Sequence, residues 1–341
     1  MPSSTSPTHP PGTRTWTAAR RFTTLPAIVL ALTGCRGEQS MLDPRGPVAE
    51  AIATTWWVMF AGAVVVLAIV MTAVFYAMFR DPEKRLSLPH IPFLIGAGLV
   101  FPTVVLTALL IYGTDVGRRI TQAFDAPLVI EVTGHQWWWE MRYPATGDAP
   151  EVVTANELRL PVGVPVEFVI ESADVVHSLW IPNLGGKVDM IPGRTNTLRL
   201  SAGEPGRFRA QCAEFCGAQH ARMGFIVIAE PQADFDAWRQ RRAALATVAP
   251  GPGLRVFSDQ GCSGCHAIAG TTAAGRGGPV LTHVADRPTL GGAAAANTPE
   301  ALRAWLADHG HTLKAGNRGP VGAELDEAQI ETLAVFLEQL K

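Results

Sequence analysis

The chain has 341 residues, enough for membrane segments and two further domains. Lys and Arg number 28 against 30 Asp and Glu, and this net charge of −2 gives no basic excess of the kind that binds nucleic acid. Charged residues make up 17% and hydrophobic residues 48% of the chain, a balance that indicates a membrane protein.

The N-terminus, residues 1–34, has the pattern of a signal peptide. Three arginines precede the apolar stretch 25–33, which is too short to span a bilayer. The letters LTGC at 32–35 resemble a bacterial lipoprotein signal, so Cys35 is the expected lipidated first residue of the mature protein. A signal cut elsewhere would instead leave Cys35 as an incidental thiol.

Two long apolar stretches predict a transmembrane hairpin within residues 35–118. Residues 52–79 carry no charge, and at about 1.5 Å per residue they exceed a hydrocarbon core of roughly 30 Å. Residues 91–112 form a second span, in which Pro102 favours a bend. The alternative, a core hairpin of a soluble protein, is disfavoured by these lengths. The basic connector 80–85 suits a cytoplasmic loop, which places both termini outside the cytoplasm.

Residues 119–232 predict an all-β domain. Five β-rich segments are bounded by Gly, Pro and Asn: LVIEVTG, VEFVIES, TNTLRLSA, RFRAQC and GFIVIAE. Short strands at this spacing indicate a Greek-key sandwich or barrel. The sequence CAEFCGAQHARM lies between the last two segments and is therefore expected in a loop at one end of the domain.

This loop carries Cys212, Cys216, His220 and Met223, and His177 follows an upstream strand. Sulfur and imidazole donors with a thioether favour copper. One tetrahedral zinc held by two cysteines and two histidines is the alternative. In a dinuclear copper centre both thiolates would bridge, and each copper would take one histidine.

The rest of the chain predicts a linker at 233–253, with helical character from 234 to 247, and an all-α domain at 254–341. The domain opens with CSGCH, the attachment motif of a c-type haem. Cys262 and Cys265 would form the thioethers and His266 the axial bond, although the motif also occurs by chance or as a redox pair.

Three stretches resemble subunit II of cytochrome c oxidase, in the haem–copper oxidase family. They are GHQWWWEMRY (134–143), DVVHSLWIPNLGGKVDMIPGR (174–194) and CAEFCGAQHARM (212–223). With the fused haem motif the chain resembles the caa-type oxidases over roughly residues 50–341. This resemblance implies a hairpin, a cupredoxin-like domain and a class I cytochrome c domain.

The resemblance also implies the roles of individual residues. Glu214 would give a backbone carbonyl to one copper, and its side chain would bind magnesium at the subunit I interface. Trp137 would admit electrons, or would simply anchor its strand. Pro279 would orient the axial histidine of the haem. The implied CuA ligands are His177, Cys212, Glu214, Cys216, His220 and Met223.

Two departures from the family pattern stand out. Residues 91–101 contain no carboxylate, which puts a proton-channel role in doubt. The stretch KAGNRGP (314–320) lacks the methionine expected as the distal haem ligand, and no methionine follows Met223. The remaining candidates for this ligand are His283, His309 and His311.

Together these features predict a subunit of a bacterial plasma-membrane oxidase, with its soluble domains in the periplasm. An external donor, cytochrome c or a bc-type complex, would reduce the haem, and copper would pass electrons to subunit I, beside subunit III. Two alternatives are the corresponding subunit of a nitric oxide reductase and a membrane-anchored copper sensor or storage module. A quinol oxidase subunit is disfavoured, because the copper ligands are usually missing there.

Overall fold

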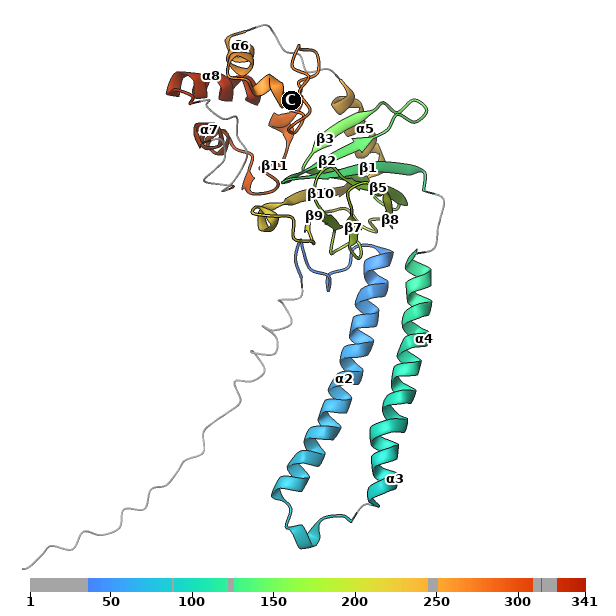
Figure 1. Ribbon diagram of the computed structural model, residues 1–341. Helices are drawn as coiled ribbons and strands as arrows, with labels where there is room; N and C mark the ends of the chain where they lie inside the picture. Colours follow the sequence, from blue (N-terminus) through green and yellow to red (C-terminus); the bar gives the residue numbers. More distant parts are fainter. Residues whose placement is uncertain (1–35, 88, 122–125, 245–250, 309–313, 315–323) are drawn as a thin grey trace, which may run out of the picture. The chain divides into compact units, whose positions relative to one another are not determined.

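The computed structural model describes residues 36–87, 89–121, 126–244, 251–308, 314 and 324–341 (Figure 1). The expected signal peptide and Cys35 lie outside the described residues, so their prediction stays a prediction.

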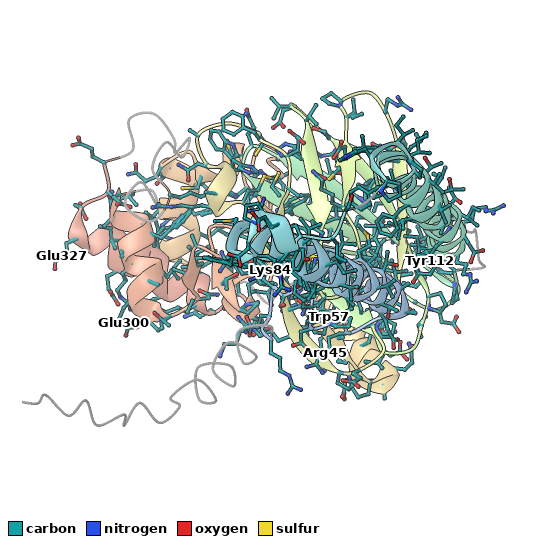
Figure 2. All side chains as sticks on the ribbon, turned by 90° about the horizontal axis from the view of Figure 1, so that it is seen from below. Arg45, Trp57, Lys84, Tyr112, Glu300 and Glu327 are labelled. Carbon is teal, nitrogen blue, oxygen red and sulfur yellow. The ribbon has the colours of Figure 1, made fainter. Side chains whose placement is uncertain are left out.

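The expected hairpin is formed by two long helical segments. The first is α2 (Pro47–Phe79), followed by the short turn η1 (Pro82–Lys84). The second comprises α3 (His90–Ile95), the π-helical η2 (Gly96–Val100) and α4 (Phe101–Thr121). Both have the length and composition to cross a membrane, and none of their most apolar stretch is buried within the chain. Figure 2 labels Trp57 of α2 and Tyr112 of α4.

The second helical segment is irregular where the sequence predicts a bend. Pro102 has no N–H and its ring crowds the carbonyl one turn earlier, so it disturbs a regular α-helix. The π-helical stretch Gly96–Val100 lies directly before this residue and takes up the misfit.

The β domain consists of two five-stranded sheets. The first has the order β3-β2-β1-β5-β8, with β1 (Leu128–His135), β2 (Trp138–Tyr143), β3 (Val152–Ala155), β5 (Val166–Ser172) and β8 (Asn196–Leu200). The second has the order β4-β10-β9-β6-β7, with β4 (Glu157–Pro161), β6 (His177–Trp180), β7 (Val188–Met190), β9 (Gly206–Cys212) and β10 (Gly224–Glu230). The short η3 (His220–Arg222) lies between β9 and β10. The five predicted strands correspond to β1, β5, β8, β9 and β10.

The core of this domain lies between the sheets. On β1 the buried side chains alternate, as Ile130 and Val132 show, because successive residues of a strand face opposite ways. Helix α5 (Gln232–Ala243) adds Phe235 and Trp238 to the same core. The helical start of the segment predicted as a linker is therefore packed into the β domain.

Four charged side chains form a network beside this core. Glu157, which is fully enclosed, accepts from Arg159 at 2.8 Å, and Arg242 lies 3.5 Å from its other oxygen. Arg159 also meets Glu230 at 3.0 Å and lies over the ring of Trp238. Enclosed charges of opposite sign compensate one another's loss of hydration.

The C-terminal domain is mainly helical, as predicted. Its elements are α6 (Pro252–Asp259), η4 (Cys262–Gly264), η5 (Val284–Asp286), the short pair β11 (Thr289–Leu290) and β12 (Ala295–Ala296), α7 (Pro299–Asp308) and α8 (Glu327–Glu338). A capping box joins Asp326 and Gln329 at the start of α8. Glu300 and Glu327, labelled in Figure 2, lie in first turns, where the helix dipole favours negative charge.

Candidate metal centres

The residues predicted to bind copper come from three neighbouring strands and one loop. His177 begins β6, Cys212 ends β9 and Met223 directly precedes β10. Strand β9 pairs antiparallel with both β6 and β10, so these starts lie beside the end of β9. The loop from β9 to β10 carries Cys216 and His220. The sheet register therefore brings a distant histidine to a local cluster.

The two thiols lie side by side, and each contacts one histidine. Cys212 Sγ and Cys216 Sγ are 3.8 Å apart, well beyond the roughly 2.05 Å of a disulfide. Cys212 Sγ is 3.8 Å from His177 Nδ1, and Cys216 Sγ is 3.7 Å from His220 Nδ1. Met223 Sδ lies 3.7 Å from Cys216 Sγ. The donors thus form a compact group in which each thiol contacts the other thiol and one histidine.

This group of donors could hold a metal. Among the described residues, the donor atoms of His177, Cys212 and Cys216 lie within 4.8 Å of one another, and His220 is outside that group. A single tetrahedral ion needs four donors that converge on one point. The carbonyl of Glu214 is 3.1 Å from Cys212 Sγ, so each thiol has a further weak donor nearby. Sulfur and imidazole donors together with a thioether are the chemistry of a copper site.

The protonation of the thiols is coupled. The contact between the thiols lowers the pKa of Cys212, and the same contact, followed by burial, raises that of Cys216. Burial alone would lower the pKa of His177, but its contacts with Cys212 and with Asp174, 2.8 Å from Nε2, outweigh this and raise it. The site thus holds one thiolate beside a histidine with raised proton affinity. Metal ions would replace these protons.

Two tryptophans of the GHQWWWEMRY stretch bond to the ligand loop. Trp137 Nε1 donates to the carbonyl of Cys216 at 3.0 Å, and Trp139 Nε1 donates to that of Met223 at 3.4 Å. Trp137 is 9% exposed, so its ring connects the protein surface with a thiolate ligand. This position suits electron admission, and it equally anchors the strand.

The haem motif forms a compact turn. The amide of His266 donates to the carbonyl of Cys262 at 2.9 Å, and His266 Nδ1 lies 2.7 Å from the carbonyl of Pro279. Burial is the main cause that lowers the pKa of His266, so its ring is neutral at pH 7. With Nδ1 bound to the carbonyl, Nε2 is left as the nitrogen that would bind iron. The turn therefore fits a covalently attached haem.

Known families match both soluble parts of this chain. Residues 145–230 match the family described as cytochrome C oxidase subunit II, periplasmic domain, and residues 252–341 match cytochrome c. Cytochrome c oxidase subunit 2 of Alkalihalophilus pseudofirmus is 34% identical over 347 residues, which cover 96% of this chain and 98% of that relative. The chain belongs to the cytochrome c oxidase subunit 2 family. The expected resemblance, including the fused cytochrome c domain, is confirmed.

Other relatives cover less of the chain. Cytochrome c oxidase subunit 2 of Bacillus subtilis is 31% identical over 267 residues, 74% of this chain and 72% of the relative. The solved periplasmic domain of subunit II (CoxB) of Bradyrhizobium japonicum is 30% identical, with a TM-score of 0.34, and covers 36% of this chain and 96% of that one. Membership in the subunit 2 family and the two apolar helices identify a membrane protein that is part of an oxidase complex.

Three residues of this subunit 2 chain were not predicted as functional. Asp174 and Gln136 contact residues that the sequence predicts as copper ligands, and only the nearby motifs DVVH and GHQW hint at them. Arg287 is enclosed in the C-terminal domain, and among the described residues its Nε meets no acceptor. Another nitrogen of the same side chain, Nη2, donates to the carbonyl of Val280. Burial lowers the pKa of Arg287 to about 10, so the side chain stays charged, and a haem propionate would neutralise it.

The predictions for the distal haem ligand and for a magnesium site have different outcomes. His283 Nε2 lies 3.0 Å from the carbonyl of Arg242 and 3.1 Å from that of Ala244, so this nitrogen is occupied and we no longer propose His283 as a haem ligand. His309 and His311 lie outside the described residues. In the described part of the chain the carboxylate of Glu214 joins no cluster of metal donors, so a magnesium site there would need ligands from another subunit.

Proposed function

We propose that this chain is the subunit through which electrons enter a respiratory terminal oxidase that reduces oxygen to water. A haem held by Cys262, Cys265 and His266 would accept electrons, and a copper pair would relay them to subunit I. The observation that carries the proposal is the group of donors in which two adjacent thiols each contact one histidine.

The copper ligands are held for electron transfer rather than for exchange of metal. Cys212, Cys216 and Met223 are at most 3% exposed, and the side chain of His177 is fully buried. Buried ligands on paired strands move little when the charge of the site changes. Both thiolates can share the added electron between two metals, so each bond would change only slightly.

The haem segment would hold its group from several sides. Cys262 and Cys265 would give the covalent links, and the carbonyl of Pro279 keeps the ring of His266 oriented through Nδ1. Arg287 would neutralise a propionate. For the distal ligand we retain His309 and His311 as candidates. Without a methionine on the iron, the reduction potential should be lower than with histidine and methionine ligation.

The subunit is expected to work within a larger complex. Phe215, between Glu214 and Cys216, is 75% exposed, an apolar ring on the loop that carries the thiols. Its ring centre lies 5.8 Å from that of His220, which lines a cavity of about 500 Å³ together with Cys212 and Trp180. An exposed aromatic ring beside a cavity at the proposed redox site suits contact with another protein. We assign this side to subunit I, which holds the oxygen-reducing site; subunit III would complete the membrane part.

We also propose the orientation and the donor. The basic turn around Lys84 would lie in the cytoplasm and both soluble domains in the periplasm of a bacterial plasma membrane. Cytochrome c or a bc-type complex would reduce the haem. This chain would therefore serve the enzyme without holding its chemical step.

Metal and spectral analysis of the purified full-length chain tests this function. We expect two coppers and one haem iron per chain, near-infrared absorption from a delocalised copper pair, and reduction of both centres by a c-type donor. Cys216→Ser should abolish the near-infrared band and leave the haem spectrum unchanged. One tightly bound zinc per chain, or exchangeable copper without haem, would refute the proposal and favour a structural or storage role.

A further inference from the structure

Gln136 lies between β1 and β2 and contacts both arms of the copper site. Its side-chain Nε2 donates to the carbonyl of Cys216 at 2.8 Å, and its main-chain N–H donates to Asp174 Oδ2 at 2.6 Å. The other oxygen of Asp174 lies 2.8 Å from His177 Nε2. A continuous series of hydrogen bonds thus joins a ligand on the loop to a ligand on β6.

We propose that Gln136 is a positioning residue of the copper centre, which sets the spacing between the thiolate loop and His177. The inference rests on the proposed function, because it assumes that these ligands hold copper. Residues that orient metal ligands commonly change metal affinity 10–100-fold when they are removed.

The loop needs such a support because it has little regular structure of its own. Cys216 lies between the end of β9 and η3, and Gly217 after it has a φ of +115°, a conformation that side chains rarely adopt. The carbonyl of Cys216 receives two side-chain donors, from Gln136 and from Trp137. These donors fix the peptide plane next to the thiolate.

The two donors also act on the charge of the site. Their positive ends point toward a residue whose sulfur would carry negative charge, and a reduced centre is more negative than an oxidised one. Hydrogen-bond donors near sulfur ligands tune reduction potentials in this way. Removal of the Gln136 donor should therefore lower the reduction potential of the copper centre.

If Gln136 only stabilised the fold, its substitution would change folding stability instead of the copper site. If Gln136 is lost, the carbonyl of Cys216 keeps its bond to Trp137, so no buried acceptor is left without a partner. The bond from the main chain of Gln136 to Asp174 also survives any side-chain substitution. We therefore expect the fold to persist and the change to appear in the copper site itself.

The test compares variants of the full-length holoprotein. Gln136→Met keeps the length of the side chain and removes the donor, whereas Gln136→Asn keeps the amide but is too short to reach. Gln211→Met is the matched control, because Gln211 precedes the ligand Cys212 and bonds to Gln39 instead of to a ligand. The readouts are copper content, the near-infrared band, the midpoint potential and the rate of copper loss to a chelator.

We expect Gln136→Met and Gln136→Asn to bind two coppers with a shifted band, a lower potential and copper loss at least tenfold faster. Gln211→Met should match the unsubstituted chain. If the Gln136 variants match it too, or if Gln211→Met shifts equally, the inference is wrong. Should a variant bind no copper, denaturant unfolding of the copper-free chain decides: unfolding like that of the unsubstituted copper-free chain supports positioning, and loss of the β structure refutes it. Absence of paired copper in the unsubstituted chain would instead refute the proposed function.

Discussion

Gly134 lies on β1 directly against the ring of His177, and a single methyl group there should displace this ligand. A Cβ at this position would lie 2.9 Å from His177 Cδ2 and 3.1 Å from Cγ. Carbon atoms in contact prefer separations of about 3.5–4.0 Å, so the ring would have to move by at least about 0.5 Å. Donor positions at metal sites tolerate about 0.2 Å.

The ring has little room to move away. The side chain of His177 is fully buried, and β6 is paired with β7 and β9. Overpacking of this kind costs about 1–3 kcal/mol of folding stability. We therefore expect Gly134→Ala to fold with reduced stability, to bind less copper and to lose the near-infrared band.

The assay combines denaturant unfolding of the full-length chain with copper content and the near-infrared spectrum. Gly186→Ala is the control, because its Cβ would meet Ile52 at an ordinary 3.8 Å. A Gly134→Ala chain with two coppers and an unchanged band would show that the site accommodates the methyl group, and the steric reasoning would be refuted.

Three further predictions concern charge and attachment. Asp174→Asn removes the carboxylate that holds His177 and should weaken copper binding about 10–100-fold in a chelator competition; unchanged affinity would show that the imidazole is held without it. Cys265→Ser should leave a haem with one thioether, through Cys262, visible as a shifted pyridine haemochrome band, and an unshifted band would argue against the attachment site. Burial raises the pKa of Glu230 above 4.5, so the folded chain holds this proton more tightly than the unfolded chain does. The stability that this group contributes is present below pH 4.5 and is lost as the pH rises through the raised pKa. Glu230→Gln should remove this part of the pH dependence of the unfolding free energy. An unaltered plot of unfolding free energy against pH would contradict the prediction.

The local features of this chain could be predicted well from its sequence. The predicted copper ligands within CAEFCGAQHARM and the haem motif CSGCH could be recognised because each is a short pattern. The chemistry of each pattern depends on residues close together in the sequence. The capping box at Asp326 is also local, and it forms as expected. Strands β1, β5, β8 and β10 have β-branched residues between turn residues, and β9 has the aromatic Phe208, so all five could be recognised.

The remaining features depend on contacts between distant parts of the chain. Strands β6 and β7 are only four and three residues long. They form because β6 pairs with β9 and β7 pairs with β6. The side chain of Gln136 donates to the carbonyl of Cys216, 80 residues further along the chain, and no local sequence pattern predicts this hydrogen bond. The packing role of α5 follows from Phe235 and Trp238, whose partners lie in the β domain. Arg287 becomes notable only once its burial is known.

The ionic network of Glu157, Arg159, Glu230 and Arg242 should restrict which substitutions relatives of this chain carry at these positions. Arg159 bridges Glu157 and Glu230, so its loss leaves two largely buried carboxylates with less compensation, at a cost of about 3–5 kcal/mol, whereas exchange of the ionic set for apolar side chains of similar volume is close to neutral. A substitution of one member alone is thus disfavoured, whereas a joint substitution of the ionic set is tolerated. Across relatives these positions should co-vary, either all ionic or jointly apolar, with mixed states rare.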